Sequence, residues 1–274
     1  MSHDPASSEW AASRGEKWLA SIVGTEAMLA PIDQPLLHAL QLTEPCTIAD
    51  IGCGGGATTL EMLRAAPPGS TAYGFDISPA LIDFARQRQP NIAFHVADVA
   101  KTPPPQLYDR LTSRFGIMFF DDPRAAFANL ARWLKPGGRF AFATWDYPAA
   151  NPWIKDVGRI ASQFVELPPL DPAAPGPFRY AEASVLLTLL ELSGFADLNV
   201  TNWQGPLAIG GGLAPAEAAT FALGAFSSFN ELLTAAGEPV YHQAHQSLNA
   251  HFAQKRQNGI VQLDASVHIF TGSL

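Results

Sequence analysis

The chain has 274 residues, enough for one large α/β domain with insertions. Charged residues make up 15% of it, against a typical ~25%, and the formal net charge is −8. The chain has no run of lysine or arginine that could bind phosphates, so the sequence argues against a nucleic acid as a partner.

Cysteine use and hydropathy bear on the compartment. The two cysteines, Cys46 and Cys53, cannot form a disulfide framework, and the polar, acidic start of the chain is unlike a signal peptide. The most apolar long stretch, residues 213–229, carries Glu217 and several small residues, which favours a buried helix over a membrane span. These features predict a cytoplasmic protein that does not bind membranes and is a monomer or a homodimer.

The first half of the chain predicts a parallel sheet covered by helices. Residues 8–38 read as helical with a break at Pro31, and from 46 onward short apolar runs alternate with amphipathic helices, as in βαβ units. Ser78-Pro79 and Asp122-Pro123 each have the pattern of a helix start. The predicted strands are 47–51, 71–75, 92–97, 109–115 and 139–145, the predicted helices include 58–66, and a turn is predicted at 135–138.

The second half has a looser pattern. After one short helix and a proline-rich loop, we expect helices at 181–193, 215–236 and 238–257 and strands at 197–207 and 260–270. Insertions at 147–178 and 210–258 flank the sixth strand. We predict that these insertions and the N-terminal helical segment 1–40 form lids over a core at 45–146, within a single domain, 1–274.

A glycine-rich segment from Asp50 to Gly56 follows the first strand. Glycines at 52, 54 and 56 allow a tight turn and let a ligand lie against the backbone, and Gly52, Gly54 and Ala57 also match a dinucleotide fingerprint. Asp50 favours S-adenosylmethionine over a dinucleotide as the cofactor. Its carboxylate would repel a pyrophosphate, whereas it attracts the ammonium and sulfonium groups of S-adenosylmethionine.

Two more acidic residues end successive strands. Asp76 lies 24 positions after Gly52, where its carboxylate can accept hydrogen bonds from both ribose hydroxyls. Asp98 ends the third strand, where it can accept from the adenine amino group while the Val99 amide meets a ring nitrogen. The alternative for each aspartate is an ordinary loop or cap residue.

Four segments, in this order, resemble the successive motifs of the class I S-adenosylmethionine-dependent methyltransferases: 50–56, 74–76, 97–99 and 134–138. The nearest likeness is to the ubiquinone/menaquinone-biosynthesis type, and it covers about residues 45–146. It implies a Rossmann-like α/β fold, with a seven-stranded, mostly parallel sheet whose last strand is antiparallel, and S-adenosylmethionine as cofactor. Gly55 departs from the family, which more often has threonine or serine there, and this departure loosens the loop.

Other segments extend the resemblance. Residues 113–116 are similar to a stretch in bacterial members, which implies that Arg114 neutralises the cofactor's carboxylate, with a surface salt bridge as the alternative. The helix with Trp10 and Trp18 resembles a segment that closes over the cofactor, with packing of both tryptophans on the core as the alternative. The expected cofactor-binding residues are Asp50, Gly52, Cys53, Gly54, Gly56, Asp76, Ile77, Asp98, Val99, Arg114, Phe115 and Trp18.

Methyl transfer asks little of a protein beyond alignment of the acceptor and exclusion of water, since the donor is already activated. The absence of a catalytic triad motif is therefore expected, since such a site needs at most one general base for a hydroxyl acceptor and none for a thiol or an amine. His242, His245 and Tyr147 are weak candidates for that base, with packing or solvent exposure as the alternative. No metal is predicted, because Asp121-Asp122 is the only adjacent acidic pair and Asp122 reads as a helix cap.

The predicted acceptor is a small apolar or aromatic molecule. The two insertions and the fifth strand carry an aromatic set that can line an apolar pocket or simply fill the core. Its members are Trp145, Tyr147, Trp153, Phe221, Phe226, Phe229, Tyr241 and Phe252. Two other functions stay open: a nicotinamide-dependent oxidoreductase, and an inactive relative of the fold that acts as a binding protein.

Overall fold

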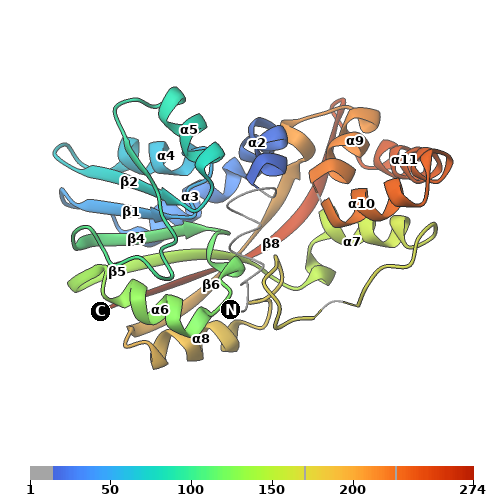
Figure 1. Cartoon of the computed structure of the whole chain (residues 1–274). Helices are drawn as coiled ribbons and strands as arrows, with labels where there is room; N and C mark the ends of the chain where they lie inside the picture. The colour runs from blue at the N-terminus through green and yellow to red at the C-terminus, as the bar shows by residue number, and fades with distance from the viewer. Residues whose placement is uncertain (1–14, 170, 226) are drawn as a thin grey trace.

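The structure, a computed structural model, describes residues 15–169, 171–225 and 227–274. Its central sheet has the strand order β3-β2-β1-β4-β5-β8-β6, with the short β7 paired to β8 (Figure 1). The strands are β1 (Thr47–Ile51), β2 (Thr71–Asp76), β3 (Ala93–Val96), β4 (Tyr108–Arg114), β5 (Leu134–Trp145), β6 (Ala196–Ala208), β7 (Arg256–Gln257) and β8 (Ile260–Ser273). Strands β1 to β5 pair in parallel, and β8 runs antiparallel to both β5 and β6. The predicted Rossmann-like, mostly parallel sheet is confirmed, and β7 adds an eighth strand to the seven that the sequence predicts.

Burial explains which strands are central. Every residue of β5 from Phe140 to Trp145 is buried, as expected for a parallel strand covered by helices on both faces. Leu207 is the one buried residue of β6, because this strand lies at the edge of the sheet. The middle of the sheet is thus a rigid support for residues at its carboxyl ends.

Short helices cover the sheet between its strands: α4 (Ala57–Ala65), α5 (Pro79–Arg88), α6 (Pro123–Ala131) and, later in the chain, α8 (Ala183–Leu192). Helices α5 and α6 begin at the two helix starts that the sequence predicts. The Ser78 hydroxyl accepts from the Leu81 amide at 3.4 Å, and Asp122 Oδ1 accepts from the Ala125 amide at 3.0 Å. Both residues are therefore N-caps, with proline next in the chain.

A second group of helices gathers at one end of the sheet (Figure 1). It contains α2 (Gly15–Leu29), α7 (Pro152–Ala161), α9 (Pro215–Ala225), α10 (Ser227–Ala235) and α11 (Glu238–Gln254). A 3-10 turn at Ala30–Ile32 separates α2 from α3 (Asp33–Leu40), so the break predicted at Pro31 is confirmed. Helix α2 packs against both α5 and α9, which brings distant parts of the chain together over the carboxyl ends of the strands.

Several element boundaries differ from the sequence prediction. The helix expected at 215–236 is two helices, α9 and α10. The strand expected at 139–145 begins at Leu134, and residues 135–138 form an irregularity between the pairs Tyr108–Leu134 and Arg110–Arg139. The last helix ends at Gln254 instead of 257, because Asn258 and Gly259 both have positive φ and form the two-residue turn of a β7–β8 hairpin.

Candidate functional site

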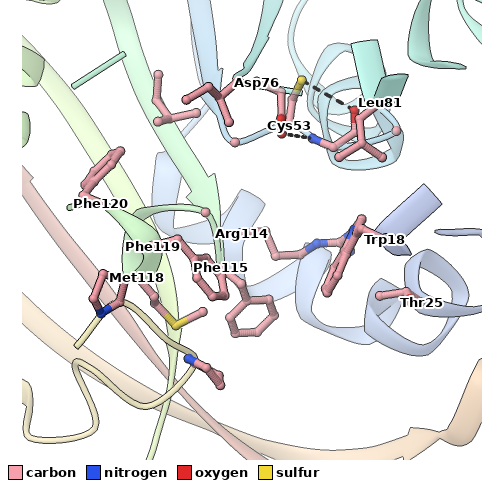
Figure 2. Close-up of a pocket in the computed structure, with 18 of the residues that line it drawn as sticks. Trp18, Thr25, Cys53, Asp76, Leu81, Arg114, Phe115, Met118, Phe119 and Phe120 are labelled. Atoms are coloured by element: carbon pink, nitrogen blue, oxygen red, sulfur yellow. Dashed lines mark hydrogen bonds between the residues drawn. The ribbon is translucent and has the colours of Figure 1, made fainter. Parts of the chain in front are cut away.

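A cavity of about 480 Å³ opens at the carboxyl ends of β1, β2, β4 and β5. Its volume lies within the range of ~300–1,000 Å³ that is typical of ligand pockets. Helix α2 forms one wall and α9 another, while the segment 175–177 of the proline-rich loop lies across it. Figure 2 shows side chains from these elements pointing into the space, among them Trp18, Asp76, Arg114 and Phe115.

The glycine-rich loop forms one side of the cavity, and its glycines serve different purposes. Gly52, Gly54 and Gly56 all have positive φ, a conformation that disfavours other residues. A Cβ on Gly52 would lie 2.8 Å from the Gly116 Cα, so this position is fixed by packing. A Cβ on Gly54 would meet only Ile22 Cδ1, at 4.0 Å, so the backbone at Gly54 borders open cavity.

Asp76 connects the glycine loop to the end of β2. Its Oδ2 accepts from the Gly54 amide and its Oδ1 from the Ser78 amide, both at 2.9 Å. Burial raises the pKa of this carboxyl, and the two amides lower it. Asp76 also borders the cavity, and a carboxylate oxygen can accept more than one hydrogen bond.

Asp50 lies beneath the loop and is 1% exposed. The Thr59 hydroxyl of α4 donates to its Oδ2 at 2.6 Å. Burial raises the pKa of Asp50 to about 7, against the opposing effects of Thr59 and Arg114. A cation in the cavity favours the charged form of this carboxyl.

Arg114 reaches the cavity from the end of β4 and extends toward Trp18 (Figure 2). Its Nη1 donates to Asp33 Oδ1 at 3.0 Å, and both side chains are about 10% exposed. Asp33 also accepts from the Thr58 hydroxyl at 3.0 Å. Arg114 therefore forms a buried ion pair, not the surface salt bridge considered from the sequence, and it also borders the cavity.

The segment that follows β3 lines the cavity on the same side as the glycine loop and Asp76. Asp98 Oδ1 accepts from the Ala100 amide at 3.1 Å, and its Oδ2 lies 3.3 Å from Lys101 Nζ. Asn129 of α6 donates from one amide nitrogen to the carbonyls of Val99, at 2.8 Å, and Thr102, at 2.7 Å. Sequence reasoning missed Asn129, because nothing local to α6 indicates this contact with a distant loop.

The opposite side of the cavity is apolar and largely aromatic. Phe115, which has a φ of 68°, stacks on Trp145 with centroids 4.1 Å apart and an interplanar angle of 8°. Trp153 of α7 lies 4.5 Å from Trp145, and Phe221 of α9 also borders the cavity. The Gly176 amide donates to the Met118 carbonyl at 3.2 Å, which ties the proline-rich loop to this side.

Only part of the predicted aromatic set reaches the cavity. Trp145, Trp153 and Phe221 line it. Phe252 is fully buried in the core and Tyr147 is 47% exposed, while Phe226 lies outside the described residues. Trp18 lines the cavity, whereas Trp10 lies in the part of the chain that is not described.

The structure does not bring the three candidate bases to the cavity. His245 lies between α11 and α9, with its Nε2 2.9 Å from the Thr220 hydroxyl. His242 is exposed on α11, with its Nε2 2.7 Å from the Gln246 amide nitrogen. Tyr147 hydrogen-bonds Glu182 at the surface. For the two histidines the reason is the orientation of α11, which packs against α7, α9 and α10 and contributes no residue to the cavity lining.

The described residues hold neither a candidate metal site nor a candidate membrane span. Residues 15–169, 171–225 and 227–274 contain no group of three or more histidine, cysteine or acidic side chains placed to hold a metal ion. Within these ranges, no helix is both long enough and apolar enough to cross a membrane.

Comparison with known proteins places the cavity in context. Residues 48–138 match a family described as a methyltransferase domain. Trans-aconitate 2-methyltransferase of Methylobacterium nodulans is 37% identical over 106 residues, 39% of this chain and 41% of that protein. Malonyl-[acyl-carrier protein] O-methyltransferase of Hahella chejuensis is 36% identical over 103 residues, 36% and 37% of the two chains. The alignments thus span about two fifths of these relatives.

A solved structure extends the likeness of fold beyond the matched segment. The YcgJ protein of Bacillus subtilis superposes with a TM-score of 0.56 at 17% identity, covering 89% of this chain and 98% of that one. At this identity the likeness concerns the fold alone. It includes most of the chain outside 48–138.

Proposed function

We propose that this chain, which carries a class I S-adenosylmethionine-dependent methyltransferase domain, is an enzyme that transfers the cofactor's methyl group to a small apolar or aromatic acceptor. One observation carries the proposal. A single cavity joins the polar side, made of the glycine loop, Asp76 and Asp98, to the aromatic side at Phe115 and Trp145. Such a space can hold a polar cofactor and an apolar second molecule together.

The polar side suits S-adenosylmethionine. In the proposed arrangement Asp76 accepts from the ribose hydroxyls, the segment at Asp98 and Val99 holds the adenine, and Arg114 faces the carboxylate of the methionyl group. Asp50 supports this orientation, because its buried carboxyl lies under the loop where a pyrophosphate would otherwise be bound. The same charge disfavours the alternative of a nicotinamide cofactor.

The chain's own contribution to the reaction is alignment and the exclusion of water. S-adenosylmethionine supplies a methyl group on a sulfonium centre, already activated for displacement. The aromatic side at Phe115, Trp145 and Trp153 holds the acceptor, while α2, α9 and the 175–177 segment shield the space from solvent. Holding two reactants in line in a dry site accounts for much of the rate of such displacements.

The cofactor assignment is tested at Asp76. We expect Asp76→Ala to weaken S-adenosylhomocysteine binding by about 2–4 kcal/mol, since two charge-assisted hydrogen bonds are lost. Isothermal calorimetry measures this loss, and Asp83→Ala is the matched control because Asp83 is an exposed acid on α5. Unchanged affinity in Asp76→Ala would show that the ribose is not held there, and tighter binding of a nicotinamide dinucleotide by the unmodified chain would favour an oxidoreductase.

The acceptor class is tested by turnover. We expect methyl transfer from labelled S-adenosylmethionine to uncharged phenols or quinols in preference to carboxylates or amines of the same carbon skeleton, because the acceptor side is apolar. Product formation is measured by mass spectrometry across matched pairs of acceptors. Turnover of the charged members alone would contradict the proposed acceptor class while leaving methyl transfer itself supported.

A further inference from the structure

The contact between α2 and the glycine loop explains Gly55. Gly55 has no positive φ, so its backbone does not need a glycine. A Cβ at this position would lie 2.5 Å from Glu26 Oε1, 3.1 Å from Ile22 Cγ1 and 3.2 Å from Phe84 Cδ1. The absence of a side chain at Gly55 therefore lets Glu26 and Ile22 of α2 lie directly on the loop.

Glu26 connects α2 to a second element of the cofactor side. Its Oε2 accepts from Arg88 Nη1 of α5 at 2.6 Å, and its side chain is 10% exposed. The Arg88 guanidinium lies 5.0 Å from the centre of the Phe84 ring, which holds it in place beside the loop. Glu26 thus lies over Gly55 while it bridges two helices.

Two oxygens of α2 in this region are buried without a hydrogen-bond partner among the described residues. They are Glu26 Oε1 and Thr25 Oγ1, and both residues border the cavity. A buried carboxylate with one unpaired oxygen lowers the stability of a fold, and this cost has to be offset by other contacts that the side chain makes. The contact that can offset the cost here is the close packing of Glu26 in α2 against the glycine loop.

We propose that Glu26 is a positioning residue that clasps α2 over the glycine loop and so slows the release of bound cofactor. The inference rests on the proposed function, because it takes the cofactor to lie against Gly52, Gly54 and Asp76. It adds a kinetic role for α2. It also couples positions 26 and 55, because Glu26 Oε1 is the atom that a Cβ at 55 meets most closely.

The test is a double-mutant cycle on the release of S-adenosylhomocysteine. Trp18 borders the cavity, so stopped-flow tryptophan fluorescence can follow release of this ligand from the full chain. We expect Gly55→Ala alone to raise the release rate about tenfold, the size of coupling typical of residues in contact. We expect Glu26→Ala to raise it as well. In the Glu26→Ala background, Gly55→Ala should have a smaller effect, because the closest of the three atoms that the new Cβ meets has gone, while the contacts with Ile22 and Phe84 remain.

The ion pair between Glu26 and Arg88 allows a second experiment that does not require the Gly55→Ala variant to fold. Glu26→Gln and Arg88→Met should each speed release, and the double variant should be no faster than the faster single one. Arg64→Met is the matched control, because Arg64 forms an exposed pair with Glu61 on α4, and it should leave release unchanged. The melting temperature of each ligand-free variant separates faster ligand release from loss of the fold.

The outcomes distinguish this inference from the proposed function. Absence of S-adenosylhomocysteine binding to the unmodified chain would overturn both. Binding that depends on Asp76, with release rates unchanged in all clasp variants, would overturn the clasp alone. Equal effects of Gly55→Ala in the presence and absence of Glu26 would also overturn it. Coupled effects in either arm support it.

Discussion

At the scale of single residues, Asp50 makes the ligand site sensitive to pH. Its pKa is about 7 in the folded chain and 3.8 in an exposed carboxyl, so the folded state binds more protons between those values. Asp50 therefore lowers stability progressively as pH rises from about 4 to 7. Arg114, Asp33 and Asp76 also act on this carboxyl, the first favouring its charge and the other two opposing it.

Cofactor binding should offset the destabilisation that ionised Asp50 causes. The ammonium of S-adenosylhomocysteine favours ionised Asp50, so we expect affinity to rise with pH up to about 7 and then to level off. Calorimetry between pH 5.5 and 8.5 measures this slope. Asp50→Asn is the control, since an amide keeps the Thr59 hydrogen bond without titrating. The same slope in that variant would show that another group, such as Asp76, is responsible.

The sequence predicted residues whose role follows from their place at a strand end. The glycine loop, Asp76 and Asp98 could be found because parallel strands end at the same edge of the sheet. Asn129, Glu26 and Asp33 were missed, since each acts through a partner that is distant in the chain. The histidines of α11 were chosen for their chemistry, and sequence periodicity alone does not say that the helix packs away from the cavity.

At the scale of elements, one asparagine fixes α7 to the sheet. Asn151 is fully buried, and its amide nitrogen donates to the carbonyls of Asp146, Tyr147 and Ser266 at 3.0 to 3.2 Å. Its Oδ1 accepts from Trp153 Nε1 at 3.0 Å and from the Ser266 amide at 3.1 Å. The aromatic side of the cavity therefore depends on a polar network behind it.

We expect Asn151→Leu to lower the free energy of unfolding by about 3 kcal/mol, since several buried groups lose their partners. Trp153→Phe removes only one donor and should cost about 1 kcal/mol while changing the acceptor KM more than S-adenosylhomocysteine affinity. Urea unfolding and steady-state kinetics measure these effects, with Asn91→Leu at an exposed position as the control. Equal stability of Asn151→Leu and the unmodified chain would contradict the role of the network.

Element boundaries were predictable where turn residues mark them. The strands of the parallel half agree with the prediction to within one or two residues, except at Leu134, because Gly, Pro or Asp residues surround them. The β7–β8 hairpin was missed although Asn258-Gly259 is a strong turn signal. The helical pattern of 238–254 runs up to this turn, and two residues are too few to register as a strand.

At the scale of the whole molecule, the lid role of the outer segments stays a prediction. We expect amide exchange in 15–30 and 171–178 to slow when S-adenosylhomocysteine binds, while the central strands change little. Hydrogen-exchange mass spectrometry checks this. Exchange that is equally slow with and without ligand across 15–30 would rule out a lid there, whereas slowing in the central strands alone would place the ligand effect elsewhere. The predicted lid residues 8–14 lie outside the described residues.

The position of β8 has a consequence for biosynthesis. This strand lies between β5 and β6, so both await a neighbour that is translated after them. Between the end of β5 at Trp145 and the start of β8 at Ile260 the ribosome adds more than a hundred residues, which at ~5–20 residues per second takes roughly ten seconds. During that interval the backbone groups of β5 that later pair with β8 have no strand beside them. We therefore expect the nascent chain to expose an unpaired strand edge, of the kind that chaperones shield, until β8 has been translated.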